Sequence, residues 1–60
     1  MNEVRFARAT QGVELTREEE AALRNKANLP YDQDQLPKEP LQREKVLRRA
    51  MDKLPGTASQ

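Results

Sequence analysis

Four prolines, at positions 30, 37, 40 and 55, constrain the fold of this 60-residue chain more than any other feature. A proline breaks a helix interior and pushes the preceding residue toward extended backbone, but it is tolerated in the first turn. Pro30 therefore ends any helix before it, whereas Pro40 suits a first helical position and Pro55 ends the helix that follows. We predict two helices joined by a proline-rich, polyproline-like loop over 29–40.

The first helix is expected over about 16–28. Thr16 and Glu19 have the spacing of a capping box, in which each side chain bonds the backbone N–H of the other residue. The glutamates at 18–20 lie in the first turn, where the helix dipole favours negative charge. Leu23 and Ala27, four residues apart, provide only a weak apolar face, so this helix needs packing to be stable.

The second helix is expected over about 40–54 and is amphipathic. At about 100° per residue, its apolar positions fall within one arc of roughly 140°. We refer to these residues as the apolar stripe: Val46, Leu47, Ala50, Met51 and Leu54. Lys45, Arg49 and Lys53 follow one border of the stripe at four-residue spacing and are called the basic row.

The segment before the first helix, 1–15, is predicted to be extended. Val4 and Phe6 alternate with polar or small residues, and Val13 and Leu15 flank Glu14, which is the period expected of a strand. The two stretches either form a short β-hairpin or lie as a tail against the helices. The fold class is then mostly α: a single small domain over 1–60, with a helical pair at 16–54 and a disordered tail at 55–60.

Composition excludes several classes of protein. Leu, Val and Phe total 11 of 60 residues, so the core is small and the domain marginally stable. Without cysteine or histidine the chain lacks a thiol nucleophile and the commonest acid–base and metal-binding group. Asp32 and Asp34 resemble the start of a calcium loop, but Pro37 stands where that loop needs glycine. We expect no enzyme, cofactor, metal or small-molecule substrate.

The sequence also contains no apolar run of the roughly 20 residues that cross a membrane. Its first residues lack the basic start and apolar core of a secretory signal. These two observations predict a cytoplasmic protein that does not contact a membrane.

Protein binding is the function that the pattern favours. The apolar stripe exceeds what the alanine-rich first helix can cover, and uncovered apolar surface is typical of an interface. We therefore predict a small regulator or adaptor that binds another protein, or a second copy of itself, through the apolar stripe, with Tyr31 of the loop adding a contact. A self-contained domain in which residues 4–15 cover the stripe is the competing interpretation.

DNA binding and a structural role are the alternatives. The basic row and Arg5 have the charge to contact phosphates, although the net charge is only +1. A subunit that folds only inside a larger assembly is the third possibility.

Residues 13–23, with the sequence VELTREEEAAL, resemble the strand-to-helix transition of ribbon–helix–helix proteins, such as antitoxins and plasmid mobilisation accessory proteins. The run LRRA at 47–50 is similar to the end of their second helix. The resemblance covers about 13–54 and implies an obligate dimer whose paired strands enter the major groove of DNA. The long, proline-containing connection at 29–40 departs from that family, and a strand at 13–15 would present only Glu14 outward.

Overall fold

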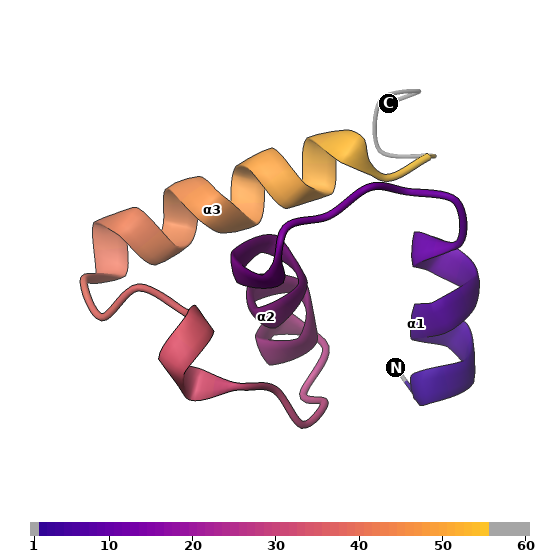
Figure 1. The fold of residues 1–60 in the computed structure, drawn as a ribbon, viewed down its shortest axis with the longest axis horizontal. Helices are drawn as coiled ribbons and strands as arrows, with labels where there is room; N and C mark the ends of the chain where they lie inside the picture. The colour runs from indigo at the N-terminus through magenta and orange to yellow at the C-terminus, as the bar shows by residue number, and fades with distance from the viewer. Residues whose placement is uncertain (1, 56–60) are drawn as a thin grey trace.

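The structure, a computed structural model, describes residues 2–55. Within them the chain forms three α-helices and one short 3₁₀ helix (Figure 1): α1 (Glu3–Thr10), α2 (Arg17–Lys26), η1 (Gln33–Gln35) and α3 (Pro40–Lys53). The expectation of a mostly α fold is confirmed. The predicted tail at 55–60 lies, apart from Pro55, outside the described residues.

The N-terminal segment is helical from residue 3 to residue 10, so the prediction of an extended segment or hairpin is wrong there. The Asn2 side chain caps α1 by accepting the backbone N–H of Arg5 at 2.9 Å, and Glu3 lies in its first turn. Phe6 is buried, whereas Val4 is 62% exposed. In a helix, residues i and i+2 point about 200° apart, so only one of the two can face the core, whereas in a strand both would share a face. The burial of Phe6 and the exposure of Val4 follow from the helical spacing.

Helix α2 begins as its sequence predicts. The Thr16 hydroxyl accepts the Glu19 N–H at 3.1 Å, and the Glu19 carboxylate accepts the Thr16 N–H at 2.9 Å, which completes the capping box. The helix ends at Lys26, two residues before the predicted boundary at 28. Asn28 adopts a left-handed φ of 60°, which asparagine tolerates at a helix C-terminus.

The loop between α2 and α3 is more structured than a polyproline-like connection. Asp32 accepts the backbone N–H of Asp34 at 3.0 Å and starts the 3₁₀ turn η1. Leu36 then inserts into the core, and Tyr31 packs against the same cluster. The connection between α2 and α3 therefore follows the protein surface and contributes to the core.

Helix α3 begins at Pro40, whose fixed φ suits the first helical position. It ends at Lys53, one residue before the predicted boundary at 54. In Figure 1, α3 passes over the N-terminal end of α2, and α1 stands beside α2 on the far side from the loop.

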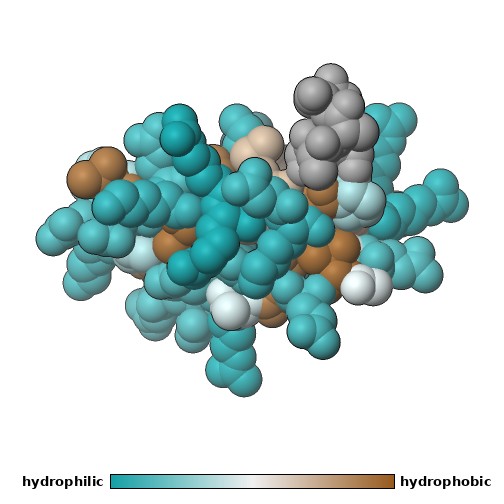
Figure 2. Space-filling model, turned by 90° about the horizontal axis from the view of Figure 1, so that it is seen from above, coloured by the Kyte–Doolittle hydropathy of each residue, from teal (hydrophilic) through white to brown (hydrophobic). Residues whose placement is uncertain are grey.

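Two buried clusters hold the helices together. One comprises Ala21, Ala22, Leu36 and Val46, and the other comprises Phe6, Leu23 and Ala50. Leu47 packs against both clusters. The surface seen from above α3 is mostly hydrophilic, with hydrophobic residues in small patches (Figure 2). Among the described residues, no helix combines the length and the hydropathy required to cross a membrane.

Candidate functional site

The apolar stripe of α3 is only partly accessible. Val46 and Ala50 are 5% and 0% exposed, because α2 packs against them together with Leu36 and Phe6. These two residues cannot contact a partner while the fold is intact, which corrects the prediction that the whole stripe forms an interface. Leu47, Met51 and Leu54 are half-buried and keep part of their surface.

Tyr31 packs against the same cluster as Leu47 but does not line the hollow that contains Met51 and Leu54. It lines hollows at the loop, one of them shared with Arg17, Arg24 and Asp32. The structure does not bring Tyr31 together with Met51 and Leu54, so a single contact surface does not include all three.

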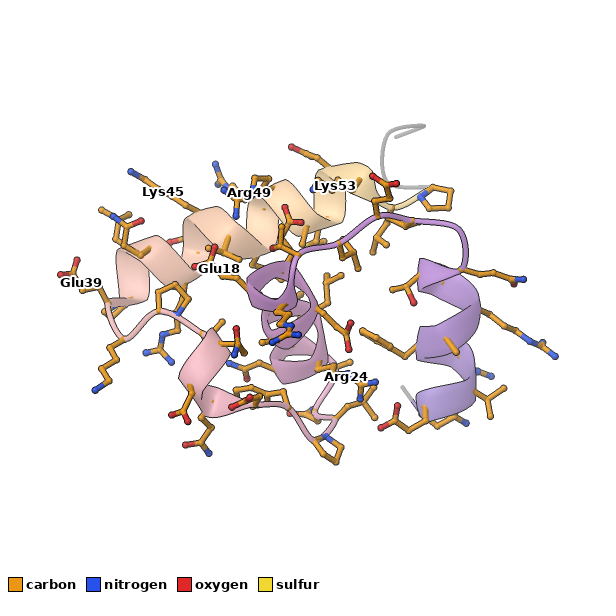
Figure 3. The ribbon with its side chains drawn as sticks, in the orientation of Figure 1. Glu18, Arg24, Glu39, Lys45, Arg49 and Lys53 are labelled. Carbon is orange, nitrogen blue, oxygen red and sulfur yellow. The ribbon has the colours of Figure 1, made fainter. Side chains whose placement is uncertain are left out.

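Two members of the basic row are bonded to α2 (Figure 3). Arg49 donates from Nε to Glu19 Oε2 at 2.8 Å and from a terminal nitrogen to Glu18 Oε1 at 3.0 Å. Lys53 donates from Nζ to Glu19 Oε1 at 2.7 Å. Because the row borders the apolar stripe, two of its cations, Arg49 and Lys53, lie against the acidic start of α2.

Glu19 has the only fully buried side chain among the larger residues that the structure describes, and it carries a charge. Burial alone raises the pKa of its carboxyl group, but hydrogen bonds from Lys53, the Thr16 N–H and Arg49 outweigh burial and lower the pKa to about 2. The carboxylate is thus ionised and has three donors. Sequence reasoning assigned Glu19 a role in the capping box and a favourable charge in the first turn of its helix. The i, i+4 spacing of Arg49 and Lys53 beside an apolar stripe is the signal that points to an acidic partner.

The other residues considered for DNA contact are dispersed. Arg5 is exposed on α1, and Lys45 is exposed on α3, where its side chain points away from the other helices (Figure 3). The predicted set of Arg5, Lys45, Arg49 and Lys53 therefore does not form one patch of free cations.

Arg24 attaches α1 to α2, a role that the sequence did not indicate. Its guanidinium donates to Glu3 at 2.9 and 3.0 Å and to Glu20 at 3.1 Å. It also lies over the Phe6 ring, 4.8 Å from the centroid, in cation–π geometry. These bonds raise the pKa of Arg24 further above its ordinary value, mainly through Glu3 and then Glu20.

An apolar groove lies where the three helices meet. Its volume is about 330 Å³. The groove is lined by residues from α1, α2, the turn after α2 and the end of α3: Phe6, Ala9, Thr10, Leu23, Lys26, Ala27, Asn28, Met51 and Leu54. We call this feature the apolar groove. It contains Met51 and Leu54 of the predicted interface, and its α1 and α2 residues were missed because α1 was expected to be extended.

The groove offers shape and apolar surface rather than reactive groups. Its only charged lining residue is Lys26. Over residues 2–55, no cluster of three or more acidic, histidine or cysteine side chains could hold a metal ion.

Comparison of the chain with protein-family models, curated proteins and solved structures finds no significant match. The resemblance to ribbon–helix–helix proteins stays a prediction. Residues 2–55 contain no strand, and 13–15 lead into α2 as irregular backbone.

Proposed function

We propose that the chain is a small protein-binding module, a regulator or adaptor without catalytic activity, and that its binding surface is the apolar groove. The observation that carries the proposal is the convergence of buried and half-buried apolar side chains from three helices on one hollow. Apolar concave surfaces of this kind accept the large side chains of a partner helix or peptide. Met51 and Leu54 link this surface to the apolar stripe on which the sequence-based prediction rested.

The state of the charged groups supports binding over catalysis. A general acid or base needs a pKa near the working pH and access to substrate. Glu19, the one buried carboxylate of the described chain, has its pKa lowered to about 2 and is enclosed by its three donors. Its geometry suits a structural ion pair that joins α2 to α3.

Site-specific photocrosslinking tests the proposal in cells. A benzoylphenylalanine residue replaces Ala9 or Ala27, which both line the groove, and in the control it replaces Gln42, an exposed residue of α3 that lines none of the hollows described above. We expect a discrete crosslinked protein with both groove positions and its absence with the control. Equal labelling from all three positions, or none from Ala9 and Ala27, contradicts the proposal.

A substitution on the groove provides the second arm of the experiment. Met51→Asp places a charge on the apolar lining and should abolish the crosslinks formed from Ala27. Circular dichroism must show that the variant retains its helices. A folded Met51→Asp protein that still forms the same crosslink also contradicts the proposal.

The DNA-binding and assembly-subunit alternatives remain predictions. Arg49 and Lys53 are each already bonded to a glutamate, which weighs against contact between the basic row and phosphate. DNA binding that weakens steeply with salt and is lost in Arg49→Ala would support the first alternative.

A further inference from the structure

A second hollow, of about 390 Å³, adjoins the apolar groove. It lies between α2 and the first half of α3, and its apolar lining includes Ala22, Leu36 and Leu47. Lys26 lines both hollows. The two hollows share this lysine and both border α3, and we refer to them together as the furrow.

The charge of this furrow is positive at its centre. Lys26 is exposed and forms no ion pair with any residue that the structure describes. Arg43 lines the second hollow, and Glu44 is the only carboxylate among the residues lining either one. A partner that covers the furrow with apolar atoms alone would remove water from the Lys26 ammonium without replacing it, which is unfavourable. A carboxylate opposite Lys26 removes that cost.

The spacing of the hollows along α3 defines the partner further. Arg43 and Leu47 line one hollow, and Met51 and Leu54 line the other. The centres of these two pairs are separated by about 11 Å at 1.5 Å per residue, or roughly two helical turns. A helix lying along the furrow would fill both hollows with apolar side chains seven or eight positions apart, and its residue midway between them would face Lys26.

From this geometry we infer that the partner presents an amphipathic helix, in which an Asp or Glu lies between two apolar groups about two turns apart and pairs with Lys26. This inference rests on the proposed binding function and specifies the partner's chemistry.

Selection from a peptide library tests it with the whole chain. The probe is a displayed library of 16-residue amphipathic helical peptides, fixed apolar at the two outer positions and randomised at the central ones. We expect enrichment of Asp and Glu at the position midway between the apolar groups. Selection against Lys26→Glu should favour Lys or Arg there instead, and acidic peptides should bind that variant about tenfold more weakly.

Two controls separate the inference from the function on which it rests. Arg48→Glu makes the same charge change on an exposed α3 residue that lines neither hollow, and it should leave the central preference unchanged. Peptides bind through the groove if their binding is lost with Met51→Asp. If such peptides show no preference for an acidic residue at the central position, the inference is overturned and the proposed function stays intact. A library that yields no groove-dependent binder overturns the inference, while the photocrosslinking result decides separately on the function.

Discussion

The ion pairs of Glu19 should stabilise the fold, and Glu19→Gln measures their contribution. Glutamine keeps the size of the side chain and the oxygen that accepts the Thr16 N–H, so the capping box can survive the change. The charge opposite Arg49 and Lys53 is lost. The substitution thus isolates the electrostatic part of the link between α2 and α3.

The magnitude follows from the pKa of the buried carboxyl group. Lowering that pKa from 4.5 to about 2 corresponds to about 3 kcal/mol at about 1.4 kcal/mol per unit. The Arg49 and Lys53 side chains are 56% and 40% exposed, so water screens both interactions. We therefore expect Glu19→Gln to lower the free energy of unfolding by about 1–2 kcal/mol at pH 7, a large part of the stability of a domain this small.

The pH dependence identifies the cause. Because the pKa of Glu19 is lower in the folded state, its contribution is complete above about 4.5 and is lost as the pH falls toward about 2. Urea unfolding followed by circular dichroism at several pH values measures it. The wild type should exceed Glu19→Gln in stability at pH 7, and the difference should shrink toward zero near pH 2.

Glu44→Gln provides the matched control, because Glu44 is an exposed glutamate without an ion pair to any described residue. It should change the stability by less than about 0.5 kcal/mol. The electrostatic reasoning is refuted if Glu19→Gln is as stable as the wild type at pH 7. It is equally refuted if the difference between them does not depend on pH.

Two further substitutions test how α1 is held. Phe6→Ala removes the one buried side chain of α1, so it should lower the free energy of unfolding by about 3 kcal/mol and increase amide hydrogen exchange throughout α1. Protection of the α1 amides equal to that of the wild type would contradict this anchoring role. Gly12 has a φ of +76° with no atom within 4 Å of an added Cβ, so Gly12→Ala should destabilise by about 1 kcal/mol through backbone strain alone; unchanged urea unfolding, with Gln11→Ala as control, would show that the loop relaxes.

Local signals predicted α2 and α3 well. The capping box joins Thr16 and Glu19, which are only three residues apart, and Pro40 and Pro55 restrict only their immediate neighbours. Both kinds of signal are therefore independent of the rest of the fold. Helix α1 was missed although Asn2 provides a comparable local signal. The alternation of Val4 and Phe6 favours a strand, but two apolar residues are too few to establish a period of 2.

The site depends on contacts between distant parts of the chain. Glu19 and Arg49 are separated by 30 residues, and only the crossing of α2 and α3 brings their side chains together. The same crossing buries Val46 and Ala50, which a helical wheel marks as apolar without showing what covers them. The groove is also lined by residues of α1, so the prediction of an extended N-terminal segment left it unpredicted.

The charged residue near the start of α2 is ion-paired with α3, whereas the one at its end is not. The first contributes to stability, and the second is available for binding. Glu19 and Lys26 are seven residues apart, about two turns, so they share one face of the helix and both adjoin α3. Glu19 is met by two cations of α3, whereas Lys26 forms no ion pair with a described residue. Reversing the charge of Lys26 breaks no ion pair among the described residues and should cost only the reversed helix-dipole interaction in the last turn of α2, about 1 kcal/mol. In a Lys26→Glu protein that stays folded, a change in partner preference therefore reports on the furrow itself.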